Sequence, residues 1–265
     1  MAIEGKNLLV RVIIAVVFGP AILFALYSGG IYLLIFLFVV VFGLTAEFGT
    51  LPAVELNVIQ EALLVAGGMF IPFLFWLGLP LPLTSWFLIF CAVWFLLELT
   101  RRPAGRGLDR AAIGPFAIVL FAWVPSLAFE LNRIEPLYAV LPIALVWTAD
   151  TFAYFIGSIL KGPKMTPVLS PNKTWSGFSG GLFGAISLAV AFKLIWPEVF
   201  EWDIIFFAVP AGIFAVLGDL FESKVKREMN IKDTSHAIPG HGGIWDRFDS
   251  WLFVQLWAWA YFVVI

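Results

Sequence analysis

Residues 31–48 read IYLLIFLFVVVFGLTAEF, an apolar run whose single charged residue, Glu47, stands next to its end. A run of this length matches the hydrocarbon core of a bilayer. Comparable runs recur along the whole chain of 265 residues, of which 62% are hydrophobic and only 13% charged. A soluble domain of this size would need far more polar surface to cover its core. The sequence therefore predicts an integral membrane protein.

The apolar runs predict an all-α, polytopic transmembrane bundle of about nine spans. Polar or Pro- and Gly-bearing links separate them, and they fall near residues 8–27, 31–48, 60–78, 83–99, 112–130, 137–158, 178–196, 203–222 and 250–265. The first run lacks a small-residue cleavage site and is interpreted as a span rather than a signal peptide. The third and fourth runs leave a second reading open, a re-entrant pair, because Pro72, Pro80 and Pro82 interrupt them.

The basic residues give the bundle an orientation. With a cytoplasmic N-terminus, 14 of the 16 Lys and Arg fall in segments on the inner side, whereas the link after the seventh span carries Glu198, Glu201 and Asp203. Cytoplasmic loops of membrane proteins are enriched in Lys and Arg. We therefore expect the N-terminus inside, the C-terminus outside and a multi-pass protein of the cell's inner (cytoplasmic) membrane.

One polar segment, residues 223–249, interrupts this apolar pattern close to the C-terminus. It mixes five basic residues, four acidic residues, both histidines of the chain and three glycines. Basic groups and glycine amides bind polyphosphates, and carboxylates among them suit Mg²⁺, which prefers oxygen ligands. Charge placement puts this segment on the cytoplasmic side, where nucleotides are. A solvated loop with ordinary helix caps is the plainer alternative.

Spacing within and before the polar segment indicates which side chains act together. Ser223 and Lys226 follow Asp219 at four and seven residues, so the three share one helix face. Asp246 and Asp249, three residues apart at the start of the last span, share another face. Two helix ends could thus offer carboxylates toward one another, with a glycine turn, residues 239–243, over the gap.

A second polar cluster precedes the segment. Asp150 lies inside the sixth span with Tyr154 one turn later, and a carboxylate inside a span is a functional candidate because it is costly there. A structural hydrogen bond to a neighbouring helix is the alternative. The following link carries Lys173 and Thr174 just before the seventh helix, where free amides could hold an anion. The nearby glycines are expected to permit close helix packing. Glu47 and Glu98, near inner ends of spans, are interpreted as topology or packing residues.

The polar segment resembles the signature of the phosphatidate cytidylyltransferases (CDP-diacylglycerol synthases). The matching positions combine hydroxyl, basic, acidic and glycine residues at fixed spacings: Ser223, Lys226-Arg227, Lys232-Asp233, Pro239 to Gly243, Asp246-Arg247 and Asp249. The upstream residues Asp150, Tyr154 and Gly157, and the link around Lys173-Thr174, also resemble the family. The motifs cover about residues 145–250, and the N-terminal half matches only in hydropathy and span number. Ser176 departs from the acidic or amide residue that relatives often carry.

The resemblance implies the reaction of CTP with phosphatidate to give CDP-diacylglycerol and pyrophosphate, dependent on one or two Mg²⁺ ions. The expected metal ligands are Asp219, Asp246 and Asp249, with Ser223 assisting. These four residues, Lys226 and Arg227 form the expected catalytic group. Substrate contacts are expected from a wider set of polar residues and glycines: Asp150, Tyr154, Lys173, Thr174, Lys232, Asp233, His241, Gly242 and Gly243. CTP and membrane phosphatidate are the expected partners. A homodimer is expected by analogy with the family, and no binding to nucleic acid is expected.

These expectations divide the chain into membrane spans that serve as a lipid-facing scaffold, residues 1–135, and a catalytic membrane region, residues 136–265, with cytoplasmic loops 159–177 and 223–249. A transporter is the main competing class, but it would need polar residues threaded through to the outer side, whereas here they gather at the inner side. A prenol-lipid kinase, which the signature disfavours, and a cytidylyltransferase acting on another lipid are the remaining alternatives.

Overall fold

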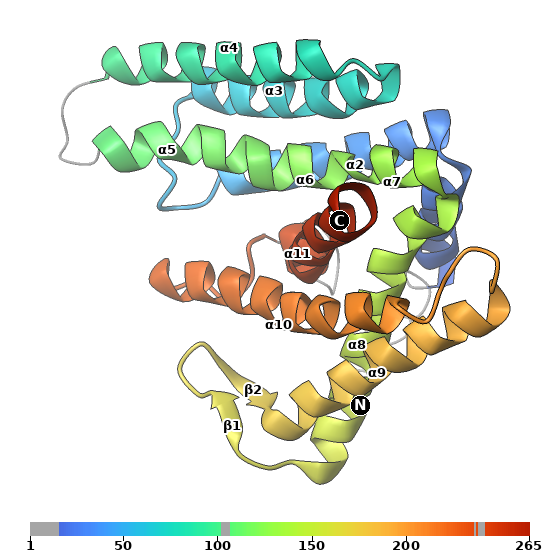
Figure 1. The fold of residues 1–265 in the computed structure, drawn as a ribbon. Helices are drawn as coiled ribbons and strands as arrows, with labels where there is room; N and C mark the ends of the chain where they lie inside the picture. The colour runs from blue at the N-terminus through green and yellow to red at the C-terminus, as the bar shows by residue number, and fades with distance from the viewer. Residues whose placement is uncertain (1–15, 102–106, 236, 238–241) are drawn as a thin grey trace. The chain divides into compact units, whose positions relative to one another are not determined.

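A computed structural model of the chain describes residues 16–101, 107–235, 237 and 242–265. The described residues are mostly helical (Figure 1). A helix over Val16–Ser28 comes first. The labelled elements follow in chain order: α2 Gly30–Gly49, α3 Val58–Leu77, α4 Pro80–Leu99, α5 Gly107–Ile118, η1 (a π-helical turn) Val119–Trp123, α6 Val124–Ser126, α7 Ala128–Ile134, α8 Pro136–Leu160, β1 Lys164–Thr166, β2 Ser170–Thr174, α9 Trp175–Ile195, α10 Ile204–Glu228, α11 Trp245–Trp259 and η2 (also π-helical) Ala260–Val264.

Six helices among the described residues are long and apolar enough to cross a membrane. They are Gly30–Gly49, Val58–Leu77, Gly107–Ile134, Pro136–Leu160, Trp175–Ile195 and Ile204–Glu228. Val16–Ser28 and Leu83–Leu99 are shorter apolar helices. The predicted all-α membrane bundle is thereby confirmed. The count of nine spans and the orientation of the termini stay predictions, and α3 runs unbroken through Pro72, one of the residues behind the re-entrant reading.

The chain forms two compact units. Unit 1 contains residues 1–130 and 233–247, and unit 2 contains residues 131–232 and 248–265. The polar segment 223–249 therefore contributes to both units, its middle to unit 1 and its two ends to unit 2. The predicted division between residues 135 and 136 separates a scaffold region from a catalytic region. Because it concerns roles rather than compactness, it stays a prediction.

Unit 1 is built on helices α2 to α5, and α3 and α4 run side by side (Figure 1). Asn57 caps α3 in a reciprocal pair of hydrogen bonds with Gln60. Beneath that cap, the buried Arg110 donates to Glu98 at 2.7 Å, and the Glu98 carboxylate also accepts from Gln60. Arg101 adds a hydrogen bond to Gln60 at 2.8 Å. This network ties the first turn of α3 to the end of α4 and to α5.

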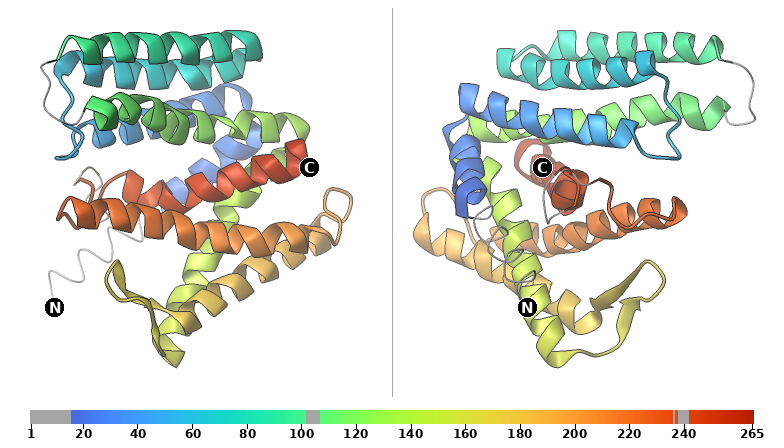
Figure 2. Two further views of the ribbon diagram at one scale, coloured as in Figure 1. Left: turned by 60° about the vertical axis from the view of Figure 1, so that its left-hand side comes forward. Right: turned by 180° about the vertical axis from the view of Figure 1, so that it is seen from behind.

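Unit 2 is organised by the antiparallel pair α8 and α9, joined by the hairpin β1–β2 (Figure 2). Glycines let the two helices touch. A Cβ on Gly181 would lie 3.2 Å from the Ala149 carbonyl, and one on Gly177 would lie 3.1 Å from the Ala153 carbonyl. The prediction that these glycines serve helix packing is confirmed. The hairpin was not predicted.

Candidate active site

Helix α10 meets α11 in unit 2 through a glycine. A Cβ on Gly218 would lie 2.5 Å from the Asp249 carbonyl oxygen and 2.8 Å from the Ser250 Cα, so only glycine fits this crossing. The next residue along α10 is Asp219. The close approach of the two backbones therefore brings the side chains of Asp219 and Asp249 together.

Three carboxylates converge at this crossing. Asp219, Glu222 and Asp249 each offer an oxygen, and the three oxygens lie within 4.8 Å of one another. Glu222 is buried, and the two aspartates are partly exposed. An all-oxygen, carboxylate-rich set at this spacing fits a hard divalent cation such as Mg²⁺. The predicted pairing of Asp219 with Asp249 is present in the structure, but Glu222 was missed.

Two lysines and a hydroxyl surround the carboxylate cluster, which we define as Asp219, Glu222 and Asp249. Lys173 reaches Asp219 from β2, with 2.7 Å between Nζ and Oδ2. Ser223 donates to the other oxygen of Asp219 at 3.2 Å, as its spacing of four residues predicts. Lys226 pairs instead with Glu222, at 2.7 Å, and both side chains are buried. The hairpin and the end of α10 thus supply positive charge to one carboxylate site.

The environment of Asp249 disfavours its charged form. Burial raises the pKa of the Asp249 carboxyl well above its ordinary value, and the negative charge of Asp219 raises that pKa further. The Ser250 backbone N–H, which donates to Asp249 at 2.6 Å, acts in the opposite direction. Asp150 adds to the rise and Lys173 opposes it. Asp150, on α8, therefore lies close enough to Asp249 to interact with its charge.

Other predicted residues of unit 2 have structural contacts. Thr174 caps α9 by accepting from the Gly177 N–H at 3.1 Å. Arg227 donates to the Leu169 carbonyl in the hairpin turn, at 3.4 Å. Tyr154 is 71% exposed on α8. Lys232 is exposed after the end of α10. Substrate contacts by Thr174, Tyr154 and Lys232 and the catalytic role of Arg227 stay predictions.

Several predicted residues of unit 1 lie together within that unit. One oxygen of Asp246 accepts from the Gly243 N–H at 2.7 Å and from the Thr234 N–H at 3.0 Å. Gly242 has a left-handed backbone, with φ +81°, and a Cβ there would lie 2.8 Å from Asp246 and 3.6 Å from Asp233, so glycine is required. His241 lies outside the described residues.

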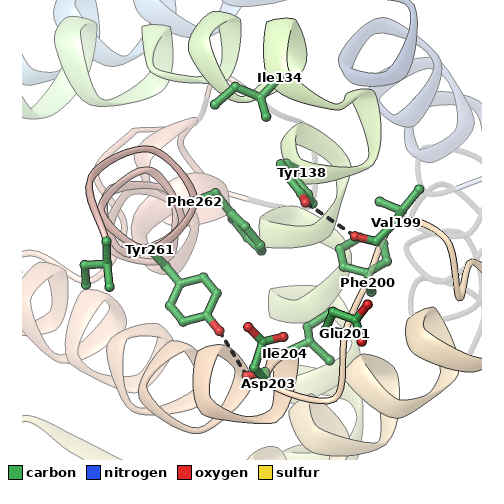
Figure 3. Close-up of a pocket in the computed structure, with 10 residues that line it drawn as sticks. Ile134, Tyr138, Val199, Phe200, Glu201, Asp203, Ile204, Tyr261 and Phe262 are labelled. Atoms are coloured by element: carbon green, nitrogen blue, oxygen red, sulfur yellow. Dashed lines mark hydrogen bonds between the residues drawn. The ribbon is translucent and has the colours of Figure 1, made fainter.

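A cavity of about 380 Å³ lies at the other end of α10 in unit 2 (Figure 3). Tyr261 donates to the Asp203 carbonyl at 3.0 Å, and Tyr138 donates to the Val199 carbonyl at 3.4 Å. Its ten lining residues carry two carboxylates and no Lys or Arg. Asp203 and Asp219 are sixteen residues apart, which is about 24 Å along a helix. This cavity suits an anionic phosphate poorly, and we place the chemistry at the carboxylate cluster.

The fold and the cluster together define a membrane-embedded protein whose polar site combines carboxylates with lysines, the combination that enzymes of phosphoryl and nucleotidyl transfer use. The chain belongs to the cytidylyltransferase family, whose model matches residues 9–265. It is therefore a nucleotidyltransferase, a membrane enzyme of phospholipid synthesis.

Several curated relatives carry the name phosphatidate cytidylyltransferase. The protein from Brucella abortus biovar 1 (strain 9-941) is 34% identical over 256 residues, which cover 92% of this chain and 89% of the relative. The protein from Bacillus subtilis (strain 168) is 43% identical over 122 residues, or 44% of each chain. The protein from Staphylococcus aureus (strain COL) is 40% identical over 140 residues, covering 51% of this chain and 53% of the relative. The predicted family is confirmed.

Proposed function

We propose that this chain transfers the cytidylyl group of CTP to phosphatidate, releasing pyrophosphate and forming CDP-diacylglycerol. The observation that carries the proposal is the carboxylate cluster beside Lys173 in a chain of the cytidylyltransferase family. Relatives named phosphatidate cytidylyltransferase support the choice of lipid.

The reaction is a displacement at phosphorus. A phosphate oxygen of phosphatidate forms a bond to the α-phosphorus of CTP, the bond from that phosphorus to the bridging oxygen breaks, and pyrophosphate leaves with the electron pair. Little covalent chemistry is required of the protein, so positioning and charge neutralisation dominate. Lys173 and Arg227 would hold phosphate oxygens, and Asp150 would bound the site from α8.

The cluster residues Asp219 and Asp249, with Glu222, would hold Mg²⁺. The ion would supply charge neutralisation at the phosphates when bound. Ser223, through its hydrogen bond to Asp219, would keep that carboxylate oriented. Asp246 and the glycine turn of unit 1 would contact the triphosphate or a second ion.

The topology is part of the proposal. Nine spans with a cytoplasmic N-terminus would bring the cluster to the inner membrane surface, where CTP is available, and the distribution of Lys and Arg supports this orientation. A homodimer, expected by analogy with the family, is checked by cross-linking in native membranes.

The test uses the purified full chain in detergent with phosphatidate, Mg²⁺ and labelled CTP, ATP, GTP or UTP. We expect a CDP-lipid and pyrophosphate from CTP alone. Asp219→Asn should abolish turnover without unfolding the protein, whereas Asp203→Asn, a matched change at the opposite end of α10, should leave it intact. Absence of a CDP-lipid product from the unmodified chain would refute the proposal.

A further inference from the structure

Glu47 is a buried carboxylate, 6% exposed, near the end of α2 in unit 1. A carboxylate in such a position is costly unless several donors satisfy it. Glu47 has four. One oxygen accepts from the Ser235 hydroxyl at 2.8 Å and from the Ile244 N–H at 2.7 Å. The other accepts from the Thr234 hydroxyl and from the Trp245 N–H at 3.1 Å.

These four donors come from both sides of the glycine turn, in a stretch about two hundred residues further along the chain. The Ile244 and Trp245 amides stand at the start of α11, where helix N–H groups lack intrahelical partners. Isoleucine offers no side-chain cap. Glu47 therefore does for α11 what a capping side chain usually does, and its negative charge suits the positive end of that helix.

Glycines on both sides of this contact permit a close approach to α2. Gly43 lies one turn before Glu47, and the side chain of Ile244 fills the space that a Cβ at Gly43 would occupy. A Cβ at Gly243 would collide with Thr234 and with Glu47. Two glycines, one on each side of the contact, thus let the stretch lie directly against α2.

The contact continues to Asp246. The Thr234 hydroxyl lies within hydrogen-bonding reach of both Glu47 and Asp246, at 2.9 Å from the latter, and its single proton serves one carboxylate at a time. Asp246 in turn accepts from the Thr234 and Gly243 amides. A displacement of Glu47 would therefore change the conformation of the stretch that carries Asp246.

We propose that Glu47 is a positioning residue of the cytidylyltransferase: its carboxylate fixes the two sides of the glycine turn and the start of α11 so that Asp246 and Gly243 are held in place. This proposal rests on the proposed function, in which these residues contact the triphosphate. It also gives the N-terminal half of the chain a positioning role in the reaction, although no motif of that half pointed to one.

The test compares two independent ways of loosening the contact. Glu47→Gln replaces two acceptor oxygens by one and turns an NH₂ group toward donors. Gly43→Ala leaves every charge in place and pushes Ile244 away. For both variants we expect amide exchange in the peptide that contains Ile244 and Trp245 to rise roughly tenfold or more, because hydrogen bonds to charged groups are lost or strained. We expect kcat/KM for CTP to fall by a similar factor.

Two matched controls lie on the same helix. Thr45→Val removes a buried hydroxyl that donates to the Val41 and Phe42 carbonyls of the same helix, and Gly49→Ala adds a Cβ that has ordinary van der Waals room. Both variants should show the same amide exchange and the same kcat/KM for CTP as the unmodified chain. The proposal would be overturned if Glu47→Gln and Gly43→Ala showed unchanged amide exchange, or if their exchange rose while kcat/KM stayed the same. Neither outcome would affect the proposed function. An unmodified chain that forms no CDP-lipid would overturn both.

Discussion

The crossing of α10 and α11 at Gly218 offers the sharpest test of the carboxylate cluster. In Gly218→Ala the added Cβ would lie 2.5 Å from the Asp249 carbonyl oxygen and 2.8 Å from the Ser250 Cα, where ordinary contact begins at 3.4 Å. The shortfalls are about 0.9 and 0.6 Å. Because both neighbours are backbone atoms, no side chain can rotate away, and the helices must separate by a comparable distance.

That separation would move Asp219 relative to Asp249. A misplacement of about 1 Å can cost roughly a hundredfold in rate. Overpacking costs about 1–3 kcal/mol, offset by about 1 kcal/mol because alanine favours a helix more than glycine does. We therefore expect turnover of CTP to fall between about tenfold and a hundredfold, with only a modest loss of thermal stability. Turnover and melting temperature would be measured in the same detergent.

The control is Gly212→Ala, on the same helix. Its Cβ would meet the end of the Leu182 side chain at 3.1 Å and the Ala185 Cβ at 3.4 Å, and the leucine can shift. This variant should keep nearly full activity. A Gly218→Ala enzyme with normal turnover, or equal losses in both variants, would refute the argument that this crossing sets the geometry of the cluster.

Three further predictions concern charge. Lys173→Gln removes the cation beside Asp219, so kcat/KM for CTP should fall about ten- to a hundredfold, while the melting temperature hardly changes because this pair is partly exposed; a large loss of stability with normal kinetics would contradict a role in phosphate binding. Because the pKa of Asp249 is raised in the folded protein, the metal-free protein should lose stability as pH rises from the ordinary carboxyl pKa toward the raised one. The gain in melting temperature on adding Mg²⁺ should grow over the same pH interval. A gain that does not depend on pH would exclude Asp249 as a metal ligand. Arg110→Met leaves the buried Glu98 carboxylate without its closest cation and should destabilise the protein by about 3–5 kcal/mol, measured by thermal unfolding, with part of the loss recovered when Glu98→Gln is added.

Local spacing made part of the site predictable. Asp219 and Ser223 stand four residues apart, and on a helix that interval alone sets their side chains side by side, as the hydrogen bond between them confirms. The apolar runs predicted the helices because a bilayer requires helices of about that length. The glycines of α9 predicted close packing because a residue without Cβ permits it.

Contacts between distant parts of the chain could not be predicted in this way. Glu47 and Thr234 are 187 residues apart, and nothing local to either residue indicates the other. Glu47 was interpreted as a packing or topology residue because it lies near the inner end of a span. The hairpin that carries Lys173 was also not predicted, because its strands have only three and five residues and show little alternation of buried and exposed positions. Glu222 was detectable: it lies three residues after Asp219, on the same helix face.

The balance of charge at the cluster argues that a divalent cation is needed for the proposed reaction. Three carboxylates lie within 4.8 Å of one another, and the two nearby lysines are each committed to one of them, Lys173 to Asp219 and Lys226 to Glu222. Burial and the neighbouring charge of Asp219 raise the pKa of the Asp249 carboxyl, and the opposing effect of Lys173 does not offset them. CTP and phosphatidate would both add negative charge to this site. Because two lysines cannot offset three carboxylates and several phosphates together, a cation held by the cluster is the simplest way to admit both substrates, and the turnover of Asp219→Asn at high Mg²⁺ measures how far that holds.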